Sequence, residues 1–474
     1  MMLVATLASM AIVTQDQAPL RAGPRDSAAQ QAVLWQGDTL EIRGERMGYL
    51  QVWDHRRERA GYVLASQVRT TSLKPEEAPE LLAVVRFLRD TPGAEALGIG
   101  YTAAYLKAVP AGAITAEPFD ALGSMAERLA RRASAQQGKA GQTVSAHLEV
   151  ATHYGVTFKS YEQDGTLRLC YDGEAFRRVI AMAANAEVRA RAALAVTRND
   201  CIDPALPPLE RQQLDAWRAE VLDRIDTAQF AQLSEPLKNR LRLRRAGVWA
   251  GVAFQQARKG QPAGASAERA LAELAAVNKA ELSDADAVDY NDAAIRVGAS
   301  RWAVQAAAAP VASGPRLSVL TEAGLPGETC VLLTDASHGP KAPLARRCTY
   351  GMVWTASASA RPDGRALALA VQPLEGWREL WVFRQDAGGW SVNVMPPAAS
   401  APELGYVEFA GWVPGGEQLL MAREARTEGR YKRSFEVAEL ATLNVQKQAS
   451  APGPLAAFGK WQDAAWKRQT VILR

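Results

Sequence analysis

The spacing of hydrophobic residues changes twice along this chain, and the two changes divide it into three regions. Between residues 12 and 72, apolar and polar residues alternate, as in residues 49–53 (YLQVW), and glycine-containing turns separate the alternating runs. An apolar residue at every second position is typical of short β-strands with one buried face. We therefore predict a small β-barrel over residues 12–72.

The second region, residues 75–312, carries apolar residues at a spacing of three and four. One such set is Phe119, Leu122, Ala126 and Leu129. This spacing places side chains on one face of a helix, so it predicts a mostly helical domain. Within it, apolar residues alternate with polar ones at Val144, Ala146, Leu148 and Val150, and Asp164-Gly165 is typical of a hairpin turn. We predict a three-stranded β insertion over about residues 143–171.

The first predicted strand of this insertion carries groups that bind metals elsewhere. An unbroken strand places His147, Glu149 and His153 on one side, and imidazole and carboxylate groups are common zinc ligands. At about 3.3 Å per residue, however, the two histidines would stand roughly 20 Å apart. That distance is too long for one ion, so we expect a solvated strand face and no metal site.

The third region, residues 315–474, has strand patterns throughout and repeats itself. Residues 361–369 lead to residues 379–383, and a similar pair of segments, 413–421 and 435–440, follows 52 residues later. Residues 326–333 form a weaker third copy. The repeat resembles the blades of periplasmic Tol-system-type β-propellers. That resemblance implies a partial or small propeller-like domain with a protein-binding surface, because the region has room for only three or four blades of about 40 to 50 residues.

Three segments of the first region resemble the bacterial SH3-like (SH3b) domain. They are residues 20–24 (LRAGP), 48–52 (GYLQV) and 61–66 (GYVLAS), with tyrosine where tryptophan is usual at positions 49 and 62. Pro19 departs from the asparagine common at its position. Such modules bind peptide or cell-wall stem peptide, or serve as spacers. The resemblance implies a shallow ligand groove lined by Trp35, Tyr49, Trp53 and Tyr62, with the alternative that about half of these residues belong to the core.

The three regions together predict a multidomain α+β protein. It comprises an SH3-like β-barrel, a central helical domain with a β insertion, and a C-terminal all-β propeller-like domain. The 55 lysines and arginines nearly balance the 51 acidic residues, and this net charge of +4 predicts no nucleic-acid partner. The densest basic run, residues 238–245, is interpreted as a solvated helix face, with peripheral contact to anionic lipid or wall polymer as the alternative.

The four cysteines fall into two local couples. Cys170 precedes Cys201, and Cys330 precedes Cys348, each couple within one predicted domain and without the spacing of a zinc site. We predict one disulfide in each couple; four unrelated buried thiols are the alternative. For Cys330 and Cys348 the flanking strand patterns and the turn between them predict a hairpin with the bond across it.

Residues 1–13 (MMLVATLASMAIV) are apolar and uncharged. Small residues at Ser9 and Ala11 match a signal-peptidase site, so residues 1–11 are interpreted as a signal-peptide remnant and the mature protein as periplasmic. The alternatives are a start codon further upstream or a buried first strand. No later apolar run reaches the roughly 18 residues of a membrane-spanning helix, so we predict no transmembrane segment.

Candidate catalytic groups are scarce. The chain has four histidines, and none lies in a hydrolase, metalloprotease or phosphate-binding motif. We predict a non-catalytic envelope binding or scaffold protein without a cofactor, whose partner is a cell-wall peptide or another envelope protein. The alternative is a cell-wall or polysaccharide hydrolase with carboxylates that one sequence does not identify. The sequence leaves the oligomeric state open.

Overall fold

The computed structural model describes residues 9–135, 139–163, 166–304, 317–399, 403–415, 417–463 and 466–467. The chain forms two compact units. Unit 1 contains the residues up to Leu206 together with Ile225–Gln232, and unit 2 contains Pro207–Arg224 and the residues from Leu233 onward. The fold is mixed α+β, and the helical region predicted as one domain is shared between the two units.

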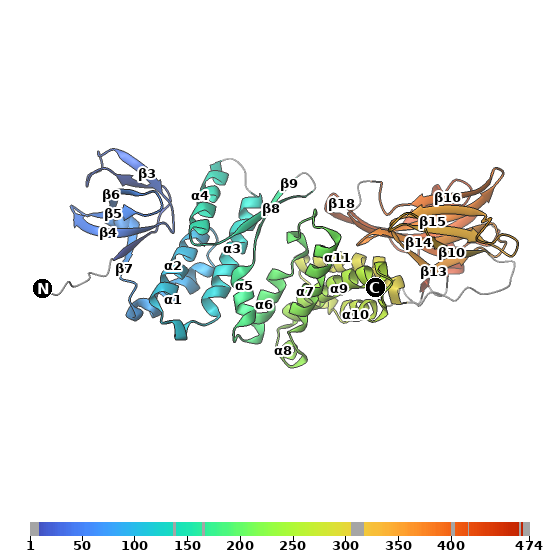
Figure 1. Ribbon diagram of the computed structural model, residues 1–474, viewed down its shortest axis with the longest axis horizontal. Coiled ribbons are helices and arrows are strands. Elements are labelled where there is room, and N and C mark those ends of the chain that lie inside the picture. Colours follow the sequence, from blue (N-terminus) through green and yellow to red (C-terminus); the bar gives the residue numbers. More distant parts are fainter. Residues whose placement is uncertain are drawn as a thin grey trace. The chain divides into compact units, whose positions relative to one another are not determined.

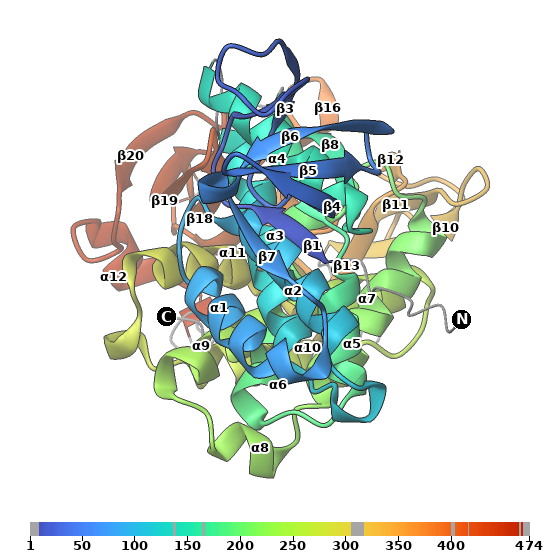
Figure 2. The same ribbon diagram turned by 90° about the vertical axis from the view of Figure 1, so that its left-hand side faces the viewer.

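Unit 1 begins with a sheet of seven strands, as the alternating pattern predicted. The strands are β1 (Met10–Val13), β2 (Ala18–Arg21), β3 (Gln30–Leu34), β4 (Thr39–Arg46), β5 (Tyr49–Asp54), β6 (Arg59–Leu64) and β7 (Val68–Thr71). Their order is β3-β2-β6-β5-β4-β1-β7, and Figure 2 shows this sheet in blue, with β4, β5 and β6 next to one another.

The sheet does not close into the predicted barrel, because no described strand joins β3 to β7. Helices cover part of the sheet instead. Ile12 of β1 belongs to the same hydrophobic cluster as residues of helices α1 (Ala78–Arg89) and α2 (Glu95–Ala108). Apolar surface of this sheet is thus buried against helices, although the sheet is not closed.

The predicted cleavage after Ala11 conflicts with this sheet. Met10 and Ala11 belong to β1, which pairs with β4 on one side and β7 on the other. Ala11, Ile12 and Val13 are fully buried. The apolar run therefore continues into an interior strand, which was the alternative interpretation of these residues, and removal of residues up to Ala11 would take away half of that strand.

The other elements of unit 1 are mostly helices. They are α3 (Glu117–Ala135), α4 (Lys139–His153), α5 (Glu174–Ala181), α6 (Ala186–Val196) and α8 (Thr227–Ala231), with a hairpin of β8 (Phe158–Gln163) and β9 (Thr166–Tyr171). The hairpin was predicted correctly, although its turn at 164–165 lies outside the described residues. The strand predicted before it is wrong: Val144, Leu148 and Ala151 recur at helical spacing in α4 and pack into the core of unit 1.

Unit 2 combines helices with the C-terminal strands (Figure 1). Its longer helices are α7 (Pro208–Asp223), α9 (Glu235–Arg258), α10 (Gly264–Ala275) and α11 (Asp284–Ser300). Ile295 and Ala299 of α11 pack against Leu404 and Tyr406 of the strand β17 (Leu404–Trp412). The boundary predicted between residues 312 and 315 falls in a segment outside the described residues.

The C-terminal strands form three successive antiparallel meanders. The first contains β10 (Ser318–Ala323), β11 (Thr329–Thr334) and β12 (Ala345–Thr349). The second contains β13 (Met352–Ala360), β14 (Ala366–Leu374), β15 (Trp377–Asp386) and β16 (Gly389–Met395). The third contains β17, β18 (Gln418–Thr427), β19 (Arg430–Glu439) and β20 (Val445–Ala449). A short parallel pairing of β15 with β17 joins the second and third meanders into one eight-stranded sheet.

The sequence repeat corresponds to this arrangement. The turn at Pro362-Asp363-Gly364 connects β13 to β14, and the turn that begins at Pro414-Gly415 connects β17 to β18. The described strands form no closed ring. Instead, helix α12 (Ala456–Trp461) contributes Phe458 to a cluster on the third meander, together with Leu420, Phe435 and Val437.

Candidate functional site

The outer face of the N-terminal sheet carries three of the four predicted groove residues. Leu50 and Val52 of β5 and Val63 of β6 belong to the core of the sheet. Side chains alternate between the two faces of a strand, so Tyr49 and Trp53 of β5 and Tyr62 of β6 lie on the opposite face. The register agrees, because Tyr62 pairs with Gln51, which lies between Tyr49 and Trp53.

Trp53 lies within a cluster of charged side chains on this face. Its cross-strand partner is Glu41 of β4. The guanidinium carbon of Arg43 lies 5.6 Å from the Trp53 ring centroid, and the ring of His55 meets Trp53 nearly at a right angle with 6.5 Å between centroids. His55 Nε2 lies 2.7 Å from a carboxylate oxygen of Glu41. The hydrogen bond with His55, followed by the bond from Arg43, lowers the pKa of Glu41.

Tyr49 is more buried than its neighbours on this face. Its side chain is 6% exposed, and its hydroxyl donates a hydrogen bond of 2.5 Å to Asp26 in the loop between β2 and β3. That bond raises the pKa of Tyr49. Tyr62 and Trp53 remain half-buried, with part of each ring accessible. Tyr49 therefore supports the face, while Trp53 and Tyr62 supply its accessible aromatic surface.

Trp35 lies in a different environment. Its ring contacts the edge of His147 in α4, with 6.4 Å between centroids, and its backbone N–H donates to Asp38. Among the described residues, the ring contacts of Trp35 do not include Tyr49, Trp53 or Tyr62. Trp35 thus belongs to the contact between the sheet and α4, and the structure does not bring the four predicted residues into one groove.

The contact between the sheet and α4 also explains the predicted His147, Glu149 and His153 set. His147 is 1% exposed, and its Nε2 lies 2.7 Å from Asp16. Glu149 accepts a hydrogen bond of 2.6 Å from Arg56. On a helix, residues two positions apart point to different sides, so these side chains do not converge on one ion. The expectation of a solvated strand face is wrong for His147, because a helix buries it against the sheet.

Both predicted cysteine pairs lie at disulfide distance. The sulfur atoms of Cys170 and Cys201 are 2.06 Å apart, and those of Cys330 and Cys348 are 1.98 Å apart. Cys330 and Cys348 are direct cross-strand partners in β11 and β12, which confirms the predicted hairpin. With Glu328, they are also the one group of potential metal ligands found in the described parts of the chain. Their sulfurs are engaged with each other, so they do not offer thiolates to an ion.

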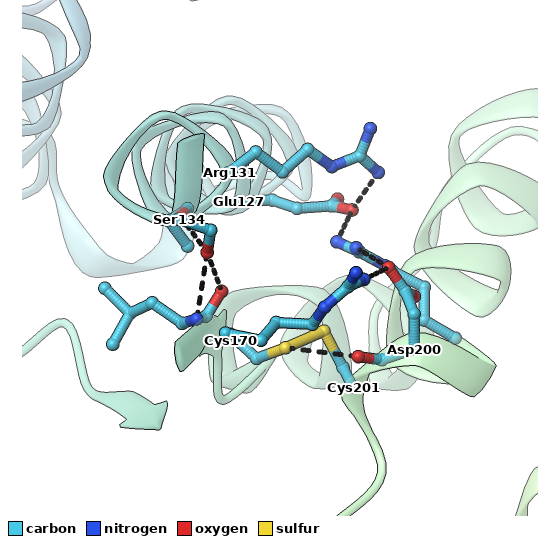
Figure 3. Close-up of a disulfide and its surroundings, with 10 residues drawn as sticks. Glu127, Arg131, Ser134, Cys170, Asp200 and Cys201 are labelled. Carbon is cyan, nitrogen blue, oxygen red and sulfur yellow. Dashed lines mark hydrogen bonds and ion pairs between the residues drawn. A yellow bond between two sulfur atoms is a disulfide. The ribbon is translucent and has the colours of Figure 1, made fainter. Parts of the chain in front are cut away.

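Figure 3 shows the Cys170–Cys201 bond within a polar network. Arg198 donates hydrogen bonds to Glu127 of α3 and to Asp200, each 2.5 Å long, and Ser134 Oγ accepts from the backbone N–H of Leu169 in β9. These contacts and the disulfide attach the segment after α6 to α3 and β9. Sequence reasoning found the bond but missed the network, because its members come from distant segments.

The basic run in α9 is paired rather than freely solvated. Arg240 forms an ion pair with Asp286 at 2.7 Å, and Lys238 forms one with Glu235 at 2.7 Å. Arg245 is buried and donates to the carbonyl of Leu222. The Arg240 and Arg245 contacts join α9 to α11 and α7, and the Lys238 pair lies within α9, which leaves little support for a polyanion-binding track.

Comparisons with known proteins add no family to this picture. No protein-family model, no curated protein and no solved structure matches the chain. Within the described ranges, every helix is too short or too polar to cross a lipid bilayer.

Proposed function

We propose that this protein is a non-catalytic binding protein of the bacterial cell envelope, exported to the periplasm. Its N-terminal module would be SH3-like and would bind cell-wall stem peptide on the outer face of the sheet. The observation that carries the proposal is the position of Trp53 and Tyr62, half-buried on the face opposite the hydrophobic core. Aromatic side chains supply contact area at a small cost in conformational entropy, so they are frequent in peptide-binding surfaces.

The charges around Trp53 suit such a ligand. Arg43 and His55 both contact the Trp53 ring and both bond Glu41, so the face offers cations and a carboxylate beside one aromatic ring. Stem peptides carry free carboxylates and amines on a short flexible chain. Pairing at an exposed surface contributes little energy per charge but fixes the orientation of the ligand.

Binding to purified cell-wall sacculi tests this function. We expect the full chain to cosediment with sacculi and to bind soluble stem peptide, and we expect Trp53→Ala and Tyr62→Ala to weaken both interactions about tenfold. The matched control is Trp461→Ala, which removes an exposed aromatic side chain from helix α12 of unit 2. Equal binding by the control and the two face variants would contradict the assignment of this face.

Incubation with the same sacculi also tests the alternative, a cell-wall hydrolase. If the full chain releases soluble wall fragments during incubation, the hydrolase hypothesis replaces the binding hypothesis. Export is tested separately by an alkaline phosphatase reporter, which folds only in an oxidising compartment, fused to the end of the chain expressed from its own gene. An inactive reporter fusion would exclude the periplasmic location.

We also propose that the C-terminal domain is a partial propeller in which the second and third meanders share one sheet. In support, the three meanders follow each other along the chain, and separate clusters lie on the two faces of the second meander. One cluster joins Leu367 and Phe383 to Val331, and the other joins Ala368 and Val382 to Val407. Because α12 covers the third meander, a fourth blade is not needed on that side. A crystal structure of the full chain would test the blade arrangement.

A further inference from the structure

A small recess of about 60 Å³ lies in unit 1, between the β1–β7 end of the sheet and helices α1 and α2. It is separate from the outer aromatic face, because Ile12 in its wall belongs to the core shared with the helices. Ile12, Leu81 and Val84 form an apolar part of the wall, and Arg69, Glu80 and Tyr101 contribute polar groups.

Tyr101 provides the strongest indication of a ligand. Its side chain is 3% exposed, and no hydrogen bond to its hydroxyl is formed by any residue in the described part of the chain. The oxygen is not among the fully enclosed polar atoms that lack a partner, so it is accessible from the recess. The hydroxyl also interacts electrostatically with Arg69 and Glu80, and burial raises its pKa. Both of these residues line the recess, so the hydroxyl faces it without a partner from the protein.

The charges of the recess favour a cation. Glu77 and Glu80 line it together with a single cationic side chain, Arg69. Glu77 is held in place by hydrogen bonds from the hydroxyl of Thr71 and from the backbone and hydroxyl of Ser72. Among the described residues, Glu80 pairs with Arg69 alone, and the side chains of Glu80 and Arg69 are 63% and 48% exposed. An exposed pair of this kind is weak and exchangeable, so Glu80 is available to a ligand.

The size of the recess and its apolar walls restrict the class of ligand further. On the same measure one water molecule needs about 10 to 15 Å³, so the recess has room for an ammonium group with the methylene groups next to it. An alkyl ammonium chain places its methylene groups on apolar walls and its charge against a carboxylate. In addition, β7 is the last strand of the sheet. No described strand pairs with the outer edge of β7, and such an edge pairs readily with an extended peptide, which would direct alternate side chains toward the recess.

We propose that this recess binds the primary ammonium of a lysine-type side chain from a peptide that adds to the edge of β7, with Glu80 and the Tyr101 hydroxyl as its polar contacts. The site goes beyond the outer aromatic face and does not depend on it.

Calorimetric titration of the full chain with three blocked tripeptides tests the site. The peptides have alanine at both ends and lysine, norleucine or arginine in the centre. We expect the lysine peptide to bind at least tenfold more tightly than the other two, because norleucine lacks the charge and the guanidinium of arginine exceeds the recess. Equal affinity for the norleucine peptide, or no measurable binding of the lysine peptide, would overturn the proposal.

Single-atom variants assign the contacts. Tyr101→Phe removes only the unpartnered hydroxyl and should weaken lysine-peptide binding about three- to tenfold, while Glu80→Gln should weaken it at least tenfold. The control is Tyr105→Phe, which alters a second buried tyrosine of α2 outside the recess and should leave affinity unchanged. If Tyr101→Phe binds like the control, the proposal is wrong.

A further variant separates this site from the outer face. Trp53→Ala should leave lysine-peptide affinity unchanged, and Tyr101→Phe should leave sacculus binding through the aromatic face unchanged. If Trp53→Ala abolishes binding of the lysine peptide, that peptide occupies the outer face and the recess proposal fails, while the proposed wall-binding function stands.

Discussion

The N-terminal sheet and the C-terminal sheets use their two faces differently. In β5 the inward residues Leu50 and Val52 are buried, whereas Gln51 is exposed and Trp53 half-buried. In β14 the residues from Ala366 to Gln372 are all buried, because one hydrophobic cluster lies on each side of the strand. A sheet covered on both faces stabilises a fold but leaves only its edges and turns for partners. The comparison therefore favours the N-terminal sheet for the ligand binding that we propose.

The largest loss of stability is expected where helix α12 packs on the third meander. Phe458→Ala should lower the free energy of unfolding by about 3 to 5 kcal/mol, because it leaves a cavity among Phe435, Leu420 and Trp466. Urea unfolding followed by tryptophan fluorescence measures the change. Trp461→Ala in the same helix removes an exposed side chain and should cost less than about 1 kcal/mol. Similar losses for both variants would mean that α12 does not close the third meander.

The next effect concerns the covalent link in the first meander. Cys348→Ser opens the bond to Cys330 and should lower stability by about 3 kcal/mol in the chain-entropy model. We expect a lower melting temperature than that of the parent under non-reducing conditions, and mass spectrometry of unreduced parent peptides should show the bond. An unchanged melting temperature would show that the paired strands alone hold the hairpin.

A smaller, pH-dependent effect is expected where α4 meets the N-terminal sheet. Burial raises the pKa of Asp16, but the hydrogen bond and charge of His147, with the bonds from Gln36, outweigh burial and hold that pKa below its ordinary value. Because its pKa is lowered, ionised Asp16 stabilises the folded protein at pH values above its unfolded-state pKa near 3.8. This stabilisation is lost as the pH falls through the folded-state pKa of Asp16. Asp16→Asn should therefore cost about 1 kcal/mol at pH 7.

The pH profile of Asp16→Asn provides its own control. The difference from the parent should be present at pH 5 and shrink below about pH 4, as the carboxylate of the parent becomes protonated. Chemical unfolding at pH 7, 5 and 3 measures it. A difference that is larger at pH 3 than at pH 5 would contradict an ionised Asp16 in the folded protein.

The smallest stability effect is expected on the outer face itself. Tyr62→Ala should change the free energy of unfolding by less than about 1 kcal/mol, because the ring is only half-buried. Its neighbour Val63 is fully buried on the other face, so Val63→Ala should cost about 2 kcal/mol. Equal losses for these adjacent residues would remove the distinction between the two faces.

Local sequence patterns determined a large part of this fold. The alternation in residues 49–53 predicted β5, the strands around Cys330 and Cys348 predicted their hairpin, and the repeat after residue 361 predicted two matching meanders. Each of these features depends on residues close in sequence, where backbone geometry fixes which side chains share a face. The segment 144–150 was mistaken because Val144, Leu148 and Ala151 also recur at helical spacing, and only packing of α4 against α2 and α3 decided between strand and helix.

The candidate sites were decided by tertiary structure. Asp16 and His147 are 131 residues apart, and the wall of the recess combines β1, β7, α1 and α2. Hydrophobic periodicity within one segment does not predict contacts between distant segments. Those contacts depend on how helices and sheets bury their apolar faces against one another. The same reason explains why Trp35, grouped by sequence with Tyr49, Trp53 and Tyr62, lies against α4 instead. The sequence thus determined which residues share a strand face, and the packing of helices on the sheet decided which of those faces remain open to a ligand.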